Sequence, residues 1–298
     1  MNVVGTEIEV SGRWLRVARL AADGYEFVDN PQPLLEEMRR SRLRADLFTF
    51  TQSLAETTPR YEYPMEWDNF AAIPVSTFEH WWNHQIRSFP RNRARQAEKK
   101  GAVIKEVPFS DALVQGIWKI YNECPVRQGK RFRHFGKDLD TVFREEATFL
   151  DSSVFAGAFL GEELIGFTKL TWDQKRNQAN LMNIISMMGH KDKAPTNALI
   201  AQAVRSCESR GIRHLVYQSF SYGKKQDDSV SHFKEVNGFQ RINVPRYYVP
   251  LTSFGAAAFR LGLHHKWIDR LPQPLMAKLR EARGAWYNRK LKYVTEAS

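Results

Sequence analysis

The sequence has 298 residues, 43% of them hydrophobic, and its 44 Lys and Arg against 33 Asp and Glu give a formal charge of +11. Eight Trp and nineteen Phe exclude a disordered or low-complexity chain, which would lack the apolar surface that offsets chain entropy. The length fits one large or two moderate domains. The charge favours anionic partners such as nucleotides, acyl carriers, RNA or lipid surfaces.

The N-terminal part mixes strand and helix signals. Residues 6–28 alternate apolar and polar positions before a turn at 22–24, which predicts a hairpin. Residues 34–44 are typical of a short basic helix, and 45–50 of a buried strand. A loop rich in Pro, Thr and Tyr follows, and it ends in Glu66, Trp67, Asp68 and Asn69. We treat residues 1–74 as an N-terminal αβ region.

A long helical pattern covers residues 76–100. Ser76 is the predicted N-cap of this helix, and Gly101 its stop signal. Its C-terminal part is the densest basic stretch of the chain, with Arg87, Arg91, Arg93, Arg95, Lys99 and Lys100. A strand at 103–107 and a helix at 110–122 are predicted next.

From residue 153 the elements follow one another regularly. The predicted order is a hairpin of 153–160 and 163–172, a strand at 179–188, a helix at 196–209, a strand at 212–220, a helix at 230–237 and a strand at 240–251. Strands alternating with helices predict an α+β fold with a mixed sheet and crossover helices. In such a sheet 179–188 and 212–220 should be neighbouring strands.

Residues 252–298 are predicted to form a basic helical tail, in which Leu275, Leu279, Ala282 and Trp286 fall at helical spacing. Such a face packs on the protein's own sheet more often than on a membrane, and peripheral membrane contact is the alternative. The N-terminus has no signal-peptide pattern, and no apolar run reaches the roughly 20 residues that span a bilayer. We therefore expect a cytoplasmic protein.

Three short motifs carry a family resemblance. The turn at 188–195 with a helix opening directly after it resembles the acyl-donor loop of the GNAT superfamily. The segment 233–239, which ends in Gly238 and Phe239, is similar to the last helix-to-strand turn of such domains. The basic segment 91–101 resembles the start of a repeat in FemAB-like acyl and aminoacyl transferases. Together these motifs lie within residues 75–251, which we treat as a GNAT-like domain.

The resemblance implies an N-acyltransferase that moves an acyl or aminoacyl group from a thioester or ester to an amine, in cell-envelope or polysaccharide precursor metabolism. It also suggests that residues 1–74 belong to a degenerate acyltransferase-like half. Acyl-CoA is the expected co-substrate, and an acyl carrier protein or aminoacyl-tRNA is the alternative. The donor loop of the family is richer in glycine than this one, where Lys191 and Lys193 stand.

The donor's phosphates need fixed positive charge and hydrogen-bond donors. The start of the 196–209 helix offers both, because its first amides point outward and Pro195 suits its first turn. The predicted contacts are Lys191, Lys193, Ala194, Thr196 and Asn197. An ordinary solvated turn is the alternative.

Attack by an amine requires a base, and the leaving group benefits from an acid. His190 is the candidate base and Tyr222 the candidate acid, since both follow predicted strands; capping and packing roles are the alternatives. Two segments could line the acceptor pocket or simply hold their loops to the core. They contribute Trp67, Asp68 and Asn69, and Arg127, Gln128 and His134.

Several other classes lack their signatures. Cys124 and Cys207 form no CxxC or Cys/His cluster, so the sequence predicts no disulfide framework and no metal site. Phosphate-binding Walker loops, dinucleotide-binding glycine motifs and a Gly-x-Ser-x-Gly elbow are also missing from the sequence. A non-enzymatic RNA-binding protein is the remaining alternative, because the basic segment 87–100 suits phosphate contacts.

Overall fold

The computed structural model describes residues 2–41, 43–127, 129–221 and 229–265. Its eleven-stranded sheet contains β1 (Asn2–Val3), β2 (Thr6–Ser11), β3 (Val17–Leu20), β4 (Leu47–Thr51), β5 (Met65–Pro74), β6 (Ala102–Val107), β9 (Ser153–Leu160), β10 (Glu163–Trp172), β11 (Gln178–Ser186), β12 (His214–Ser219) and β13 (Gln240–Pro250). Two short strands, β7 (Val126–Arg127) and β8 (Lys130–Arg131), form a separate hairpin.

The helices are α1 (Gln32–Arg40), α2 (Phe78–His80), α3 (Ser88–Lys99), α4 (Asp111–Asn122), α5 (Leu139–Glu146), α6 (Pro195–Ser209), α7 (Ser229–Val236) and α8 (Ser253–Arg260). A π-turn, η1 (Trp81–Gln85), continues α2, and the 3-10 turns η2 (Leu150–Ser152) and η3 (Lys191–Lys193) precede β9 and α6.

The sheet runs through two lobes. Its strand order is β1-β2-β3-β4-β13-β5-β12-β11-β10-β9-β6. The pairs β3–β4 and β11–β12 are parallel and the other pairs antiparallel. The predicted α+β fold with a mixed sheet is therefore confirmed, as is the pairing of the strands predicted at 179–188 and 212–220.

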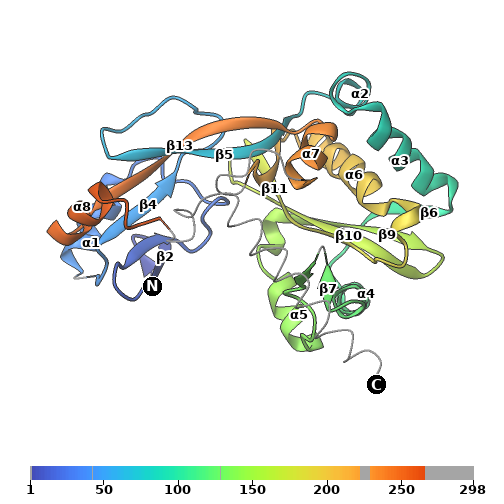
Figure 1. The fold of residues 1–298 in the computed structure, drawn as a ribbon, viewed down its shortest axis with the longest axis horizontal. Helices are drawn as coiled ribbons and strands as arrows, with labels where there is room; N and C mark the ends of the chain where they lie inside the picture. Colours follow the sequence, from blue (N-terminus) through green and yellow to red (C-terminus); the bar gives the residue numbers. More distant parts are fainter. Residues whose placement is uncertain (1, 42, 128, 222–228, 266–298) are drawn as a thin grey trace.

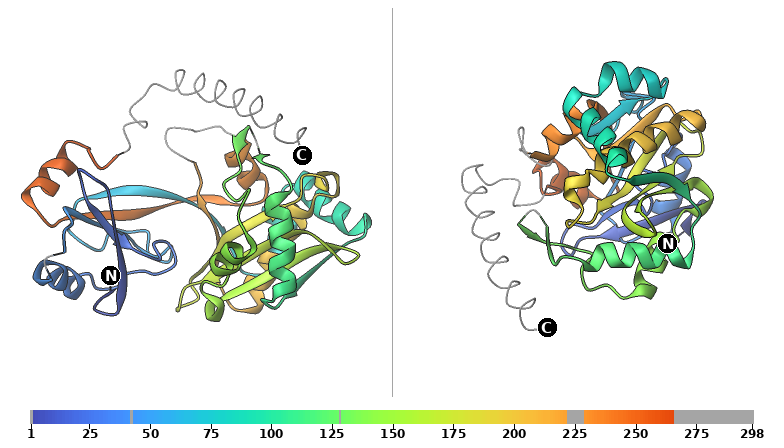
Figure 2. Two further views of the ribbon diagram at one scale, coloured as in Figure 1. Left: turned by 90° about the horizontal axis from the view of Figure 1, so that it is seen from below. Right: turned by 90° about the vertical axis from the view of Figure 1, so that its right-hand side faces the viewer.

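The strands β5 and β13 join the lobes (Figure 1). β13 pairs with β4 through its second half and with β5 through its first half. Figure 2 shows the same arrangement from below, with the N-terminal lobe at one end of these two strands and the larger lobe at the other. The sheet thus continues across residue 74, where the sequence analysis divided the chain.

Helices cover both faces of the sheet in the larger lobe. In Figure 1, α3, α6 and α7 lie on one face and α4 and α5 on the other. One apolar cluster contains Ile200, Val204 and Leu170 under α6, and another contains Ile117, Tyr121 and Phe167 under α4. The apolar stripe of each amphipathic helix is buried against the sheet in this way.

The predicted single helix at 76–100 is wrong, because Pro90 interrupts it. A continuous helix would place Pro90 in its interior, where proline has no amide hydrogen to donate and its ring clashes with the preceding turn. The chain instead becomes extended at Ile86 and Arg87, and α3 restarts at Ser88 so that Pro90 lies in its first turn. The N-cap is Thr77 rather than Ser76: its side chain accepts from the His80 amide at 3.0 Å.

Three further predictions need correction. The connection of the N-terminal hairpin lies at 12–16, between β2 and β3, and not at 22–24. The acidic segment 66–69, predicted as a loop, belongs to β5, because Arg246 on the paired strand β13 compensates Asp68 with a 2.6 Å contact. Residues 122–134, also expected to be a loop, contain the β7–β8 hairpin.

Other local signals are confirmed. Ser110 caps α4 by accepting from the Leu113 amide at 3.3 Å, and Pro195 is the first residue of α6. Gly101 ends α3 with a φ of 82°, a left-handed conformation that glycine adopts without steric cost. Most of the predicted basic tail, including Leu275 to Trp286, lies outside the described residues. Among the helices that the structure describes, none combines the length and apolar character needed to cross a bilayer.

Candidate functional site

The parallel strands β11 and β12 separate from each other partway along their length. Their pairing covers only Gln178–Asn180 against His214–Val216, although β11 continues to Ser186 and β12 to Ser219. Burial changes at the same place, because residues 178–181 are buried and residues 182–186 are half-buried. The two strands therefore diverge into an opening in the sheet, which we call the splay.

Irregular backbone marks both sides of the splay. On β11, Met182 is an extra residue between Leu181, paired with Leu170, and Asn183, paired with Lys169. On β12, Gln218 has a φ of +48° beside a register shift toward β5. Bulges re-aim side chains and backbone groups and recur next to active sites, and a left-handed φ is costly for a residue other than glycine.

Helix α6 begins at the open end of the splay. The Thr196 hydroxyl lies 2.9 Å from the Ser186 hydroxyl at the end of β11. The side-chain amide of Asn197 (Nδ2) donates to the side-chain oxygen of Asn237 (Oδ1) at 3.2 Å. Asn237 follows the last residue of α7. Ala194, with a φ of 53°, turns the chain into the helix, and the first residue, Pro195, has no amide hydrogen. Thr196 is thus the first residue of α6 whose backbone could donate to an anion.

The loop before α6 is held from two sides. The Glu123 carboxylate accepts from the amides of Met188 and Gly189 at 2.7 and 2.8 Å. On the other side, Arg93 of α3 donates to the Lys191 carbonyl at 3.0 Å, and Lys100 pairs with Asp192 at 2.8 Å. A carboxylate therefore already uses two amides that an anionic ligand would need.

The two predicted lysines differ in their surroundings. Lys191 is exposed, whereas Lys193 is half-buried and lies 3.5 Å from the Asp192 carboxylate. Asp192 also contacts Lys100, and these lysines lower the pKa of its carboxyl group, with the Lys100 hydrogen bond as the largest cause. The two lysines and the α6 N-terminus thus lie on one short segment, and their contact with a donor stays a prediction.

His190 is oriented by an acidic partner. Its Nε2 atom lies 3.4 Å from the Glu163 carboxylate at the start of β10, and 19% of the side chain is exposed. Its Nδ1 atom is buried and has no hydrogen-bond partner among the described residues. A histidine held by a carboxylate at one nitrogen has the arrangement of an oriented base, and an unsatisfied buried nitrogen calls for an explanation. Tyr222, the predicted acid, lies outside the described residues.

Arg127 ties the β7–β8 hairpin to the end of β11. Its guanidinium donates to the carbonyls of Ser186 at 2.7 Å and Ile120 at 2.9 Å, and it pairs with Glu123 at 3.3 Å. The ring of Phe132 lies 4.3 Å from the guanidinium carbon. Desolvation lowers the pKa of Arg127. The Arg127 side chain therefore positions its loop beside the splay. The predicted residue Gln128 lies outside the described residues.

A buried polar network lies on the α4–α5 side of the splay. Glu146, at the end of α5, is 1% exposed. Its carboxylate accepts from the Tyr121 hydroxyl at 2.8 Å and from the Asn183 amide at 2.9 and 3.1 Å. Lys169 of β10 donates to the backbone carbonyls of Glu146 and Thr148, both at 2.7 Å. Asn183 lies on the unpaired half of β11, so the network reaches the splay through it.

Burial shifts the acid–base properties of this network. Desolvation raises the pKa of Glu146, although the Tyr121 hydrogen bond opposes it. Desolvation also lowers the pKa of Lys169 to about 8, against the attraction of Glu146. Perturbed titrating groups of this kind gather at functional sites, and also in structural ion-pair networks.

His134 packs against the same network. Its ring stacks on Tyr121 with centroids 4.2 Å apart, and its Nε2 atom accepts from the Arg133 side chain at 2.8 Å. Desolvation, followed by the charges of Arg133, Lys137 and Arg127, lowers its pKa to about 3. The imidazole is therefore neutral at neutral pH.

The three predicted residues of β5 lie elsewhere along the sheet. Asn69 accepts from the Ser221 amide at 2.8 Å and thereby holds the chain that follows β12. Asp68 pairs with Arg246, and Trp67 is 54% exposed. Because β5 pairs with β12 whereas Arg127 contacts the end of β11, the structure places the two predicted acceptor segments on different sides of the splay.

A cavity of about 990 Å³ lies beyond α7, between this helix, η1 and the start of β13. Arg87, Arg241 and the histidines His84 and His232 line it together with one acid, Glu235. Trp81 borders this region and donates to the Asn237 carbonyl at 3.1 Å. The two arginines outnumber the single acid, so the lining carries a positive charge that suits an anionic portion of a ligand.

The sequence analysis missed Glu146, Lys169, Asn183 and Glu123. Two of these had a local signal. Lys169 stands within the apolar run of β10, where a charged residue is rarely buried without a partner, and Glu146 follows the buried Val142 at helical spacing. For Glu123 and Asn183 the signal lies only in the tertiary contacts.

Comparison with known proteins gives structural similarity alone. No protein-family model matches the chain, and no curated protein matches its sequence. The structure of L-PGS from Bacillus licheniformis aligns with a TM-score of 0.56 at 12% identity, covering 85% of this chain and 83% of that one. The C-terminal domain of a provisional lysylphosphatidylglycerol synthetase from Agrobacterium fabrum aligns with a TM-score of 0.54 at 11% identity, with the same coverage.

FemX aligns with a TM-score of 0.54 at 8% identity, over 80% of this chain and 83% of that chain. These alignments cover both lobes and not the larger lobe alone, since they include at least four fifths of the residues. The chain therefore has the GNAT-like α+β fold of these structures.

Proposed function

We propose that the protein is an acyltransferase that moves an acyl or aminoacyl group from a thioester or ester donor to an amine. The observation that carries the proposal is the splay, where β11 and β12 part beside the N-terminus of α6. Ligands in open sheets with parallel strands bind outside the carboxyl ends of those strands, at such a point. The similarity to FemX and L-PGS supports a group-transfer reaction of this class.

In this reaction the acceptor nitrogen attacks the donor carbonyl carbon. The new C–N bond forms, the C–S or C–O bond to the donor breaks, and the nitrogen loses a proton to a base. We place the carbonyl at the Met182 bulge, where a backbone amide released from the ladder would stabilise the oxyanion. The departing thiolate or alkoxide takes up a proton, for which Tyr222 remains the candidate.

Glu146 is our proposed proton acceptor. Its carboxylate accepts hydrogen bonds from Asn183, which lies on the open half of β11. A proton could therefore reach it directly or through one water. Its raised pKa makes it a stronger base than an ordinary carboxylate. His190, oriented by Glu163, is the alternative base.

The surroundings of α6 support a donor that carries phosphates. Lys191, Lys193, Ala194, Thr196 and Asn197 remain the proposed donor contacts, and acyl-CoA the first donor to test. The amides of Met188 and Gly189 are already bound by Glu123, so the lysines would carry most of the attraction for phosphates. The cationic cavity beyond α7 would suit the larger anionic carrier of an aminoacyl-tRNA or acyl carrier protein. One relative's name denotes the lysyl ester of a lipid headgroup, which adds aminoacyl donors to the test.

The test begins with mass spectrometry of ligands retained by the purified protein. Acetyl-CoA, longer acyl-CoA, acyl carrier protein and aminoacyl-tRNA are then compared as donors by the release of the deacylated carrier. We expect one donor class to be consumed faster with protein than without it. If no donor binds and none is consumed, the acyltransferase proposal is wrong, and salt-sensitive RNA binding without turnover would support the RNA-binding alternative.

The base is tested by Glu146→Gln, with Glu145→Gln as the matched control on the exposed side of α5. Glu146→Gln should lower kcat by about 10²- to 10⁴-fold with little change in the donor KM, while circular dichroism shows an intact fold. Glu145→Gln should keep the parental rate. If Glu146→Gln is fully active and His190→Asn is not, the base is His190 and the assignment of Glu146 fails.

A further inference from the structure

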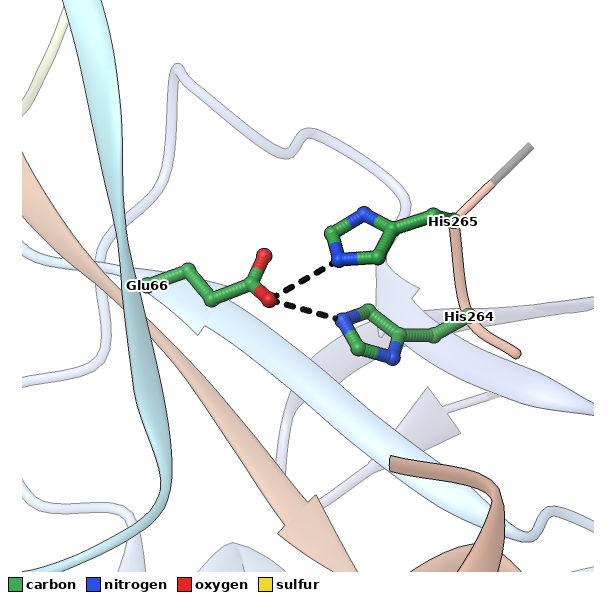
Figure 3. A group of neighbouring side chains, drawn as sticks. All are labelled: Glu66, His264 and His265. Carbon is green, nitrogen blue, oxygen red and sulfur yellow. Dashed lines mark hydrogen bonds and ion pairs between the residues drawn. The ribbon is translucent and has the colours of Figure 1, made fainter. Parts of the chain in front are cut away.

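A carboxylate and two consecutive histidines meet at the end of the N-terminal lobe (Figure 3). The Nε2 atoms of His264 and His265 each lie 3.0 Å from the same oxygen of Glu66, Oε1. The possible ligand atoms of the three residues all lie within 4.8 Å of one another. Glu66 belongs to the acidic segment 66–69, whereas the two histidines are part of no motif of the sequence, and none of the three residues lies at the splay.

The fold brings the three residues together from distant parts of the chain. Glu66 lies near the start of β5, and the histidines follow α8, 198 residues later for His264. His264 is held firmly: its side chain is 3% exposed, and its ring packs between Tyr248 and Phe259 with centroid distances of 4.7 Å to each. His265 is 45% exposed and stacks on His264 at 4.0 Å.

The nearest arginine on the paired strand contacts other acids and not Glu66. Arg246 pairs with Glu66 in the strand register, yet its guanidinium contacts Asp68 at 2.6 Å and Asp23 at 3.0 Å. Two acids therefore neutralise this arginine. The Glu66 carboxylate, 35% exposed, points its Oε1 atom toward both imidazoles.

The spacing is close to that of a metal site. Zinc binds histidine nitrogen and carboxylate oxygen at about 2.0–2.1 Å, and a tetrahedral ion then holds its ligand atoms about 3.4 Å apart. The two N···O distances of 3.0 Å need only a small expansion to admit the ion. Two histidines and one glutamate form a known ligand set for zinc, with a fourth position open to water.

We propose that Glu66, His264 and His265 bind a divalent transition-metal ion, with zinc as the best chemical match. The ion would join β5 to the segment after α8 and so fasten the C-terminal part of the described chain to the N-terminal lobe. A link between segments so far apart in sequence restricts the unfolded chain more than a local one. The site is independent of the proposed acyl transfer.

The experiment uses protein without a polyhistidine tag, stripped with a chelator and titrated with Zn²⁺ and with Co²⁺. The exposed pair His80 and His84, with ring centroids 5.1 Å apart, could bind the same ions, so the variant His80→Ala/His84→Ala serves as the background. In this background we expect one ion per chain, a visible Co²⁺ spectrum typical of four-coordination, and a higher melting temperature with Zn²⁺.

Glu66→Gln and His265→Ala, both at partly exposed positions, should each weaken binding by roughly tenfold or more while the melting temperature without metal changes little. If the two variants bind Zn²⁺ as tightly as the background protein, the proposed site is wrong. It is equally wrong if removing His80 and His84 abolishes all binding. Neither result depends on a donor or on catalytic turnover.

Discussion

His134 shows how one buried side chain responds to its neighbours. Arg133 donates to Nε2, Lys137 lies 3.3 Å from Nδ1, and the ring is 6% exposed. A proton on this ring would be both poorly solvated and close to two cations, which is why its pKa falls to about 3 from 6.5. The stack on Tyr121 connects this effect to Glu146.

The pH dependence of stability follows from this shift. Between pH 6.5 and about 3, His134 binds a proton in the unfolded chain and not in the folded protein. Its contribution to the free energy of unfolding is therefore fully present above pH 6.5 and is lost as the pH falls toward 3. The loss is at most about 1.4 kcal/mol per pH unit. His134→Phe keeps a ring on Tyr121 and should remove this part of the slope. Urea unfolding of both proteins from pH 7 to pH 4 measures it.

The exposed His80 provides the control, since His80→Phe should leave the slope of the parent unchanged. Parallel stability profiles for the parent and His134→Phe would contradict the inferred pKa of His134 and show that the acid sensitivity arises elsewhere.

At the scale of elements, the segment between β11 and α6 combines rigidity with positive charge. Glu123 from α4 and Arg93 from α3 hold its backbone on either side, while Lys191 remains exposed. At an exposed site a helix end contributes about 0.3–1 kcal/mol to anion binding, and each exposed charge about 0.2–1 kcal/mol. Side-chain charge should therefore matter at least as much as the helix end.

Replacing Lys191 and Lys193 together by Ala should raise the donor KM about three- to tenfold, because each exposed charge contributes about 0.2–1 kcal/mol. The acceptor KM and kcat should change little, and added salt should reproduce part of the effect by screening. Steady-state kinetics with the donor that the comparison of carriers identifies measure this change.

Lys105→Ala/Lys119→Ala removes two exposed lysines from other elements and should leave the donor KM unchanged. If the loop variant has the donor KM of the parent at low salt, with its circular dichroism intact, the phosphates bind elsewhere. The cationic cavity beyond α7 would then be the next place to examine.

At the scale of the molecule, the two lobes depend on β5 and β13. Where these strands pass between the lobes, Arg246 of β13 is 16% exposed and bridges Asp68 of β5 to Asp23, which follows β3. The contact joins three separate segments of the sheet. Without their shared, half-buried partner, the two acids are left close together with no counter-charge.

Arg246→Ala should therefore lower the free energy of unfolding by about 3 kcal/mol or more, as measured by urea unfolding at neutral pH. Arg241→Ala, at an exposed position of the same strand, should cost under about 1 kcal/mol. Equal losses for the two variants would mean that the Arg246 bridge contributes no more than a surface contact.

The amino-acid sequence by itself determined the local elements wherever a signal lies within a few residues. Ser110 and Pro195 set the starts of α4 and α6, Gly101 ends α3, and the β9–β10 hairpin and the β11–β12 pairing were predictable from apolar runs and their order. Pro90 was a local signal for the break before α3. The helical periodicity of residues 76–100 nevertheless led to the prediction of one continuous helix. His190 and the lysines lie on one segment, so their proximity was predictable too.

Only the tertiary structure decided which distant residues meet. Glu146 and Asn183 come from α5 and β11, Glu123 reaches the donor loop from α4, and Glu66 meets His264 from the other end of the chain. Periodicity and caps report on neighbours within a helical turn or a strand, whereas these contacts depend on the strand order and on where β11 and β12 separate. The burial that shifts the pKa of Glu146 and His134 arises from the same packing, because desolvation is a property of the surrounding fold and not of the residue.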